Sequence, residues 1–389
     1  MKQLSDTQIR RARAILADGK GIPEALADTV PVAVGVHDVL GVRRQLRAAI
    51  GGAGPILQPL LEDPQVTDIL VNGVHGVWID RGRGLEAVAV STGLLDTPQQ
   101  VRDLAVRLAA ASGQRLDDAS PIVDGTLEGG LRLHAVLPPL AWEGPFISLR
   151  SHRAVTLTLD ELVASGTVPV QLSAVLVALI NRHANVMISG ATGSGKTTLL
   201  SALLSQASAA ERILIIEEAA ELRPRHPHAI HLQVRHANVQ GSGEVGMVDL
   251  VRAALRMRPD RIVLGECRGA EVREVLAALN TGHEGGWATV HANSAHDVPA
   301  RLVALGALAG MTEAVVAAQA ASALDAVIHI DKNNGQRRIS QVATLERHGD
   351  ELVTCGALEC VDGDEGQRRV VPGPGWPRLA RRLALRDSI

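Results

Sequence analysis

Short apolar runs recur through the second half of the chain, and longer segments with helical spacing separate them. The runs cover residues 213–216, 262–264, 287–290 and 326–330. A run with little polar alternation predicts a strand that is buried on both faces of a parallel sheet. The segments between the runs are rich in Ala, Leu, Val and Arg, so this half of the chain predicts a doubly wound α/β fold.

The first half of the chain shows shorter strand patterns and one clear helix. Residues 131–137 alternate between apolar and polar as a half-buried strand does, and 146–150 predict another short strand. Residues 68–73 and 76–82 have the pattern of two strands joined in a hairpin. With an Ala/Leu/Val helix over 101–111, this half predicts a smaller, separate α/β domain.

The two ends of the chain differ from both α/β segments. The first residues are polar with helical spacing, and the Gly-rich run 51–55 breaks that pattern. The end of the chain is rich in Pro, Gly and Arg, and it predicts a loosely packed segment. The predicted division is a helical N-terminal extension (1–54), an N-terminal α/β domain (55–155), a larger α/β domain (156–348) and a C-terminal appendix (349–389).

Composition narrows the classes of function. Of the 389 residues, 46% are hydrophobic, which suffices for a substantial core, and the formal net charge is −3. A near-neutral charge gives no bulk attraction for nucleic acid. Single-stranded nucleic acid would also need aromatic side chains for stacking, yet the chain has four Trp, one Phe and no Tyr. We therefore do not expect nucleic acid as a partner.

The cysteines and the apolar runs indicate a compartment. Cys267, Cys355 and Cys360 form no CxxC pair, so we expect a reducing compartment and neither a disulfide framework nor a zinc module. The first residues lack an apolar signal core, and the longest apolar runs are too short to span a membrane. These features predict a cytoplasmic protein that reaches a membrane only by binding a partner.

A phosphate-loop motif lies near the middle of the chain. Residues 190–197 fit the pattern GxxxxGK[ST] in full, between a predicted strand over 185–189 and a predicted helix over 198–204. In such a loop the backbone N–H groups converge on phosphate oxygens, the lysine reaches the β- and γ-phosphates, and the following hydroxyl holds Mg²⁺. ATP and Mg²⁺ are the expected ligands, with the Mg²⁺ on Thr197. The predicted nucleotide-binding residues of this motif are Gly190, Ala191, Thr192, Gly193, Ser194, Gly195, Lys196, Thr197 and Thr198.

Carboxylates follow two of the predicted buried strands. Glu217 and Glu218 come directly after one, and Glu266 comes shortly after another. Because ligands bind at the carboxyl ends of the strands in open α/β sheets, we expect these acids near the γ-phosphate. One would position or deprotonate the attacking water, and Glu217 and Glu266 would contact Mg²⁺, partly through water. The alternative for each acid alone is a solvated strand end.

Two histidines flank the predicted strand over 287–290. His283 precedes this strand, and His291 and Asn293 follow it. A histidine at the carboxyl end of a strand can sense the γ-phosphate and relay its loss, so we predict His291 in the catalytic set and His283 in the nucleotide-binding set. The alternative for either histidine is a hydrogen bond that only holds a loop.

Together these stretches resemble the motifs of the type II/IV secretion ATPase superfamily. The subfamily that the sequence resembles is the CpaF/TadA-type ATPase of Tad/Flp pilus systems, and 68–73 and 130–139 add to this similarity. Departures from the pattern are Glu218, where Asp is usual, Cys267 and Trp287. The Walker A, Asp box, Walker B and His box are similar, in that order, to residues 190–198, 216–221, 255–269 and 281–294.

The resemblance implies a homo-hexameric ring whose subunits each close an N-terminal domain over a RecA-like P-loop ATPase domain. It implies that ATP hydrolysis drives an inner-membrane platform protein, in Tad/Flp-type IV pilus assembly or in type II/IV protein secretion, from the cytoplasmic side of the membrane. It also implies that Arg132 and Arg150 of the N-terminal domain are catalytic, since both lie on strands that match the family's arginine-bearing positions.

Alternatives remain open for the whole chain and for two clusters. The chain could be a RecA-like nucleic-acid translocase, or a nucleotide-dependent assembly module without hydrolysis, which the departure at Glu218 allows. A metal site is one reading of the histidines, but no cysteine or carboxylate accompanies them at ligand spacing, so we favour a polar strand and loop. An arginine-rich face is predicted to be partly solvated and partly in a subunit interface. The histidines are His226, His228, His231 and His236, and the arginines are Arg252, Arg256, Arg258 and Arg261.

Overall fold

Two compact units make up the chain, and the division lies between Ala154 and Val155. Nearly all of the predicted extension over 1–54 lies outside the residues that the structure describes. Among the described residues, no helix is both long and apolar enough to cross a lipid bilayer. The computed structural model describes residues 53–82, 84–89, 95–127, 130–151, 156–235, 243–333, 335–362 and 368–386.

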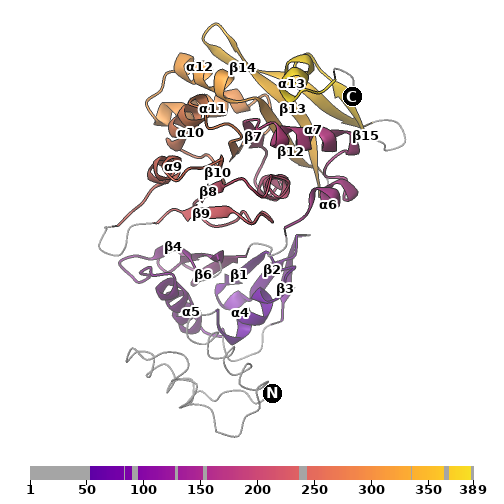
Figure 1. Ribbon diagram of the computed structural model, residues 1–389. Coiled ribbons are helices and arrows are strands. Elements are labelled where there is room, and N and C mark those ends of the chain that lie inside the picture. The colour runs from indigo at the N-terminus through magenta and orange to yellow at the C-terminus, as the bar shows by residue number, and fades with distance from the viewer. Residues whose placement is uncertain are drawn as a thin grey trace. The chain divides into compact units, whose positions relative to one another are not determined.

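The first unit is a six-stranded sheet in the order β3-β2-β1-β6-β5-β4, with two helices, α4 and α5, on one face (Figure 1). Every neighbouring pair of strands is antiparallel. A capping box of Thr97 and Gln100 starts α5. The elements are α4 (Gly54–Leu61), β1 (Asp68–Asn72), η1 (Gly73–His75), β2 (Val77–Asp80), β3 (Leu85–Val88), α5 (Pro98–Ala111), β4 (Ile122–Thr126), β5 (Arg132–Val136) and β6 (Phe146–Arg150).

Alternation along the strands places one face of this sheet in a core. Leu133 of β5 and Leu149 of β6 are 1% exposed, and they lie in a cluster with Leu104 and Leu108 of α5. The residues between them on each strand are half-buried or exposed. The strands and the helix that the sequence predicted in this half are therefore confirmed.

The second unit is a nine-stranded mixed sheet in the order β15-β14-β13-β12-β7-β11-β10-β8-β9. The six strands from β12 to β9 in that order are parallel, and β13, β14 and β15 continue the sheet as an antiparallel meander. The helices are α6 (Leu159–Ala164), α7 (Val170–Asn181), α8 (Lys196–Leu204), α9 (Met247–Leu255), α10 (Glu271–Asn280), α11 (Val298–Leu308), α12 (Glu313–Ala323) and α13 (Trp376–Leu383). The strands are β7 (Val186–Ser189), β8 (Ile213–Glu217), β9 (Ala229–Gln233), β10 (Arg261–Leu264), β11 (Trp287–Val290), β12 (Ala326–Asn333), β13 (Gln336–His348), β14 (Glu351–Asp362) and β15 (Arg368–Pro372).

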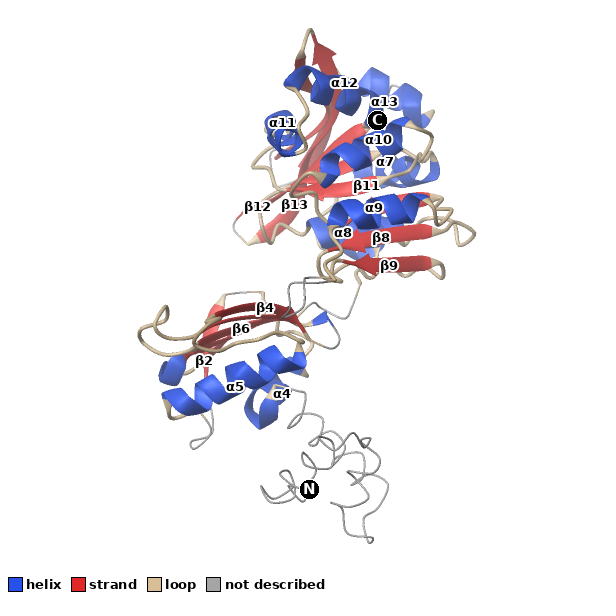
Figure 2. Cartoon of the chain, turned by 90° about the vertical axis from the view of Figure 1, so that its left-hand side faces the viewer, coloured by secondary structure: helices blue, strands red, loops and turns tan. Residues whose placement is uncertain are grey.

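Helices cover both faces of this larger sheet (Figure 2). Ile213 and Ile215 of β8 pack into a core with α6, α7, α8 and α13, whereas Leu214 and Ile216 pack into a second core with α9 to α12. All four side chains are 0% exposed. Burial on both faces explains why this strand has no polar alternation, and the predicted doubly wound α/β fold is confirmed.

The predicted loosely packed appendix over 349–389 is wrong. β14 and β15 pair in the sheet, and α13 buries Trp376, Leu379 and Leu383 at 1–2% exposure. Arg382 Nε donates to Asp325 Oδ1 at 2.8 Å, and its Nη1 donates to the Arg182 carbonyl at 2.9 Å at the end of α7. The last helix therefore belongs to the core of the second unit.

Candidate active site

The phosphate loop leaves the carboxyl end of β7 and enters α8, which begins at Lys196. Gly193 has φ of 73° and Gly195 has φ of 102°, in the left-handed region where a Cβ is strained. Gly190 allows a close approach, because a Cβ there would lie 2.3 Å from the carbonyl oxygen of Ile330. The three glycines therefore have physical reasons to lack side chains, as expected for a loop that wraps phosphate.

Lys196 lies at the base of this loop. Its side chain is largely buried at 6% exposure, and Nζ donates to the carbonyls of Gly190 at 2.9 Å and Ala191 at 3.0 Å. Burial lowers the pKa of the ammonium, while the charge of Glu266 raises it. The amine is therefore held inside the loop beside a carboxylate that opposes the loss of its charge.

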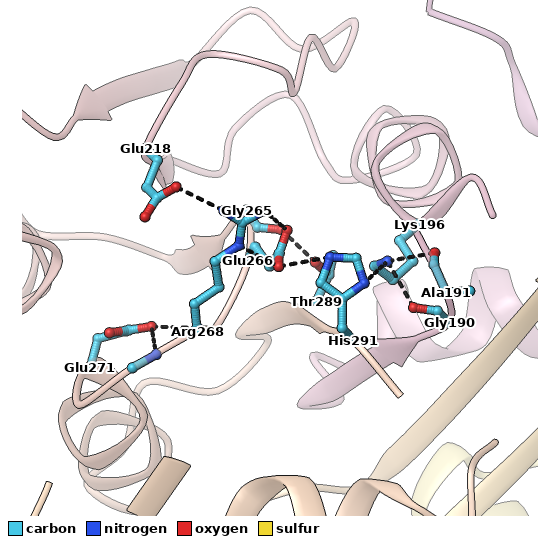
Figure 3. Close-up of polar contacts among 11 residues, drawn as sticks. Gly190, Ala191, Lys196, Glu218, Gly265, Glu266, Arg268, Glu271, Thr289 and His291 are labelled. Atoms are coloured by element: carbon cyan, nitrogen blue, oxygen red, sulfur yellow. Dashed lines mark hydrogen bonds and ion pairs between the residues drawn. The ribbon is translucent and has the colours of Figure 1, made fainter. Parts of the chain in front are cut away.

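A chain of polar contacts runs from Lys196 across the ends of three strands (Figure 3). Lys196 Nζ lies 3.1 Å from His291 Nδ1, and His291 Nε2 lies 2.9 Å from Glu266 Oε1. Arg268 holds Glu266 in a two-point contact, with Nε to Oε1 at 2.5 Å and Nη2 to Oε2 at 2.9 Å. Its Nη1 also donates to Glu218 Oε2 at 3.1 Å. The structure thus joins the predicted residues Lys196, His291, Glu266 and Glu218 in one network.

His291 is a neutral link in this network. Burial lowers the pKa of its ring most, Glu266 raises it, and Lys196 lowers it. A lysine can only donate, so Nδ1 accepts from Lys196 and the Nε2–H donates to Glu266. The imidazole therefore connects Lys196 directly to the strand-end carboxylate Glu266.

Glu217 makes contacts of its own in the turn after β8, and its predicted catalytic and Mg²⁺-binding role stays a prediction. The side chain is 4% exposed, and its Oε1 accepts the backbone N–H groups of Glu221 at 3.0 Å and Leu222 at 2.8 Å. A Cβ on Gly265 would lie 2.7 Å from Glu217 Cγ. The carboxylate therefore fixes the turn after β8, and Glu266 and Glu218 are the acids of the contact network.

His283 is also placed apart from the loop. In the parallel pairing of β7 with β11, Trp287 faces Val186 and Val290 faces Ser189. His291, which follows β11, therefore lies at the same sheet edge as the phosphate loop, whereas His283 precedes β11 at the opposite edge. Within one chain, the predicted nucleotide-binding role of His283 is not supported by its position.

Arg132 and Arg150 belong to the first unit, where they are cross-strand partners in the β5–β6 pairing. They alternate with Leu133 and Leu149, so they lie on the sheet face opposite the helices. The two predicted arginines therefore lie next to each other on that face. Their contribution to catalysis stays a prediction.

Sequence reasoning missed three residues that organise the loop after β10. Arg268 lies within the stretch that resembles Walker B, but its two-point contact with Glu266 depends on a local turn. Glu271, at 6% exposure, accepts the backbone N–H groups of Arg268 at 2.6 Å and Gly269 at 2.7 Å. Thr289 Oγ1 donates to the Gly265 carbonyl at 2.6 Å. An acid two residues after a glycine, at a helix start, was the available signal for Glu271.

Residues of the histidine cluster and of the arginine-rich face make hydrogen bonds and ion pairs within the second unit. His226 Nε2 lies 2.9 Å from the Ser208 carbonyl, and His228 Nε2 lies 2.7 Å from Arg212 Nη1. Arg261 is 1% exposed, is paired with Glu211, and donates to the Ile180 carbonyl at 2.7 Å. Arg261 is therefore a buried residue, contrary to the predicted solvated or interface face. His236 lies outside the described residues.

The residues of the loop fit a nucleoside triphosphate with its Mg²⁺. Residues 191–193 are exposed, so their backbone is open to a ligand, while Ser194 and Lys196 are buried beneath them. Ser194 Oγ is buried and has no hydrogen-bond partner among the described residues, which is expected where a polar ligand supplies one. The Thr197 hydroxyl oxygen, in the first turn of α8, is the ligand that would fit Mg²⁺.

Comparisons with known proteins relate the chain to one family. A family model described as type II/IV secretion system protein matches residues 52–371. The chain is 48% identical over 321 residues to a putative conjugal transfer protein of Mycobacterium tuberculosis, covering 81% of this chain and 90% of that one. It is 31% identical to the conjugal transfer protein TrbB of Rhizobium radiobacter, covering 78% and 91%.

A solved structure shows the same fold. The Legionella pneumophila ATPase DotB aligns with a TM-score of 0.50 at 20% identity, covering 80% of this chain and 81% of that one. The match of the family model and the identity to the Mycobacterium tuberculosis protein both extend over most of the chain. The chain therefore belongs to the type II/IV secretion system protein family.

Proposed function

We propose that this chain is an ATP-hydrolysing motor that works as a hexameric ring at the cytoplasmic face of a membrane. The observation that carries the proposal is the contact chain from Lys196 through His291 to Glu266. It links the group that would bind the β- and γ-phosphates to the acid that would act on the attacking water. A loop that only binds nucleotide has no need of that link.

In this proposal each residue has one task. Lys196 neutralises phosphate charge, and the Thr197 hydroxyl holds Mg²⁺, which when bound neutralises charge on the β- and γ-phosphates. Glu266 accepts the proton of the attacking water. His291 stands between Glu266 and Lys196, so it is placed to report a change at the γ-phosphate to the strand end. Glu218 tunes Glu266 through their shared partner Arg268.

The work of the motor is the finer part of the proposal. We propose that the ring drives an inner-membrane platform protein in Tad/Flp-type pilus assembly or in type II/IV secretion. The sequence resemblance supports the pilus role, and the family description, type II/IV secretion system protein, supports a role in secretion. Arg132 and Arg150 would complete the site when the first unit closes on a nucleotide, so that hydrolysis depends on domain movement.

Two measurements on the purified chain test this function. Steady-state phosphate release with Mg-ATP should be measurable without nucleic acid, and solution mass should be that of a hexamer with a non-hydrolysable ATP analogue. No phosphate release from a chain that binds ATP would favour an assembly module without hydrolysis. DNA-stimulated release with a steep salt dependence would favour a nucleic-acid translocase.

A further inference from the structure

The β12–β13 hairpin extends past the end of β7, next to the phosphate loop. β12 pairs with β7 only over Ala326–His329, but it continues in pairing with β13 to Asn333. Residues 330–333 and the start of β13 therefore lie beyond the strand that leads into the loop. This hairpin begins the antiparallel meander, which the sequence did not predict.

Side chains and backbone of this hairpin pack directly on the glycines of the loop. The Ile330 carbonyl oxygen lies 2.3 Å and its Cγ2 3.1 Å from where a Cβ of Gly190 would be. A Cβ on Gly195 would lie 3.0 Å from Arg337 Cδ and 3.5 Å from Ile330 Cδ1. Any shift of the loop would therefore change its packing contacts with Ile330 and Arg337.

Arg337 also bonds the loop. Its Nε donates to the Gly193 carbonyl at 3.0 Å, although 144 positions separate the two residues in the chain. A trans peptide directs its C=O and the next N–H to opposite sides. Holding the Gly193 carbonyl toward the hairpin thus keeps the Ser194 N–H on the other side of the peptide, where it donates to the Ala191 carbonyl at 3.3 Å and closes the turn of the loop. Arg337 therefore supports the folded shape in which a phosphate loop binds its ligand.

We propose that Arg337 is a positioning residue for the nucleotide, acting through the Gly193 carbonyl to preorganise the phosphate loop. The proposal rests on the proposed nucleotide binding of this site. Because the loop is held in its binding shape before the ligand arrives, Arg337 contributes to affinity for the nucleotide, and the catalytic carboxylate Glu266 is untouched. The meander thereby becomes part of the nucleotide site.

The test separates the hydrogen bond from the packing. Arg337→Met keeps an unbranched stem against Gly195 but removes the Nε–H. Arg338→Met is the matched control, since it removes the same charge one residue later, where Arg338 Nε instead pairs with Asp331 Oδ1 at 3.0 Å. The measurements are the Kd for fluorescent MANT-ADP with Mg²⁺, and kcat and KM for ATP.

We expect Arg337→Met to raise the Kd for MANT-ADP and the KM for ATP about 3- to 10-fold, in the range of one hydrogen bond from a charged group at a solvent-exposed position. The kcat should stay within about twofold, as should every constant of Arg338→Met, because the partner of Arg338 Nε is Asp331 of β12 and not the phosphate loop. Arg337→Lys should restore part of the affinity, because its ammonium can donate to the same carbonyl.

Three results would overturn the proposal: unchanged MANT-ADP binding in Arg337→Met, an equal loss in Arg338→Met, or a fall in kcat with an unchanged Kd. Failure of the proposed function is a different result, in which the wild-type chain itself neither binds MANT-ADP nor hydrolyses ATP. That outcome would remove the basis of both proposals. Equal binding of MANT-ADP by the wild-type chain and by Arg337→Met would refute only the role of Arg337.

Discussion

Glu266→Gln should separate nucleotide binding from hydrolysis. The change keeps the shape of the side chain and leaves an amide oxygen that can still accept from Arg268. It removes the group that we assign as the acceptor of the proton from the attacking water. ATP should therefore bind and persist on the variant.

The size of the effect follows from two different roles of the same carboxylate. As a base, Glu266 should contribute about 10²- to 10⁴-fold to turnover. As the partner of Arg268 it stabilises the fold little, because Arg268 is 46% exposed and Glu266 is 22% exposed. Partly exposed pairs of this kind contribute about 0–1 kcal/mol to the free energy of unfolding. Turnover should collapse while stability stays almost unchanged.

The assay compares Glu266→Gln with Glu218→Gln. Both changes remove one carboxylate partner of Arg268, but Glu218 is 43% exposed and contacts Arg268 at a single nitrogen. Steady-state phosphate release and the amount of ATP still bound after a long incubation are measured on both. We expect a few-fold loss of turnover in Glu218→Gln and retained ATP in Glu266→Gln.

Wild-type turnover in Glu266→Gln would refute the assignment of the base. If Glu218→Gln then lost turnover by 100-fold or more, the base would be Glu218. A loss of ATP binding in Glu266→Gln would instead show that the carboxylate serves the loop through His291, and that the two roles are not separable as argued.

The remaining predictions concern the first unit, a buried histidine and the loop glycines. Arg132→Ala or Arg150→Ala should lower turnover about 10- to 1000-fold, in the range of a lost in-cis arginine, with solution mass unchanged; wild-type turnover in both would exclude them from the active site. His329 is 5% exposed and its Nδ1 lies 2.9 Å from Ser189 Oγ; burial lowers the pKa of its ring below the ordinary 6.5, while Asp331 raises it. The unfolded chain therefore binds the proton more readily, so the free energy of unfolding should fall as pH drops below about 6.5 toward the lowered pKa. In urea titrations at pH 7 and pH 5, His329→Asn should lose less of its unfolding free energy between the two pH values than the wild-type chain does. Gly190→Ala places a Cβ 2.3 Å from the Ile330 carbonyl oxygen and should cost about 1–3 kcal/mol of unfolding free energy; an unchanged urea midpoint would contradict that contact.

Local patterns predicted the core of the larger unit well. The run 213–216 is apolar because both faces of β8 are covered. The loop over 190–197 can be identified from the spacing of its own residues, without knowledge of its neighbours in the fold. Lys196 was found because it belongs to the loop, and Glu266 and His291 were found because each comes shortly after a buried strand; parallel strands bring such ends to one sheet edge.

Roles that depend on a partner far away in the chain were not predictable. Glu217 and Glu218 look equivalent as strand-end acids, yet only Glu217 is enclosed by the turn to Leu222 and by Gly265. Arg337 is one basic residue in a polar stretch of sequence. It contacts the phosphate loop only because the register of β13 against β12 places it there. The end of the chain was misjudged because its Pro and Gly content outweighed the apolar spacing within 376–383.

The most direct test of the central claim is steady-state phosphate release by Lys196→Ala beside the wild-type chain. We predict Mg-ATP turnover in the wild type and none above background in the variant, since Lys196 donates to a loop carbonyl, contacts His291 and would neutralise the phosphate charge. Equal turnover by the two proteins would show that hydrolysis does not take place at this loop.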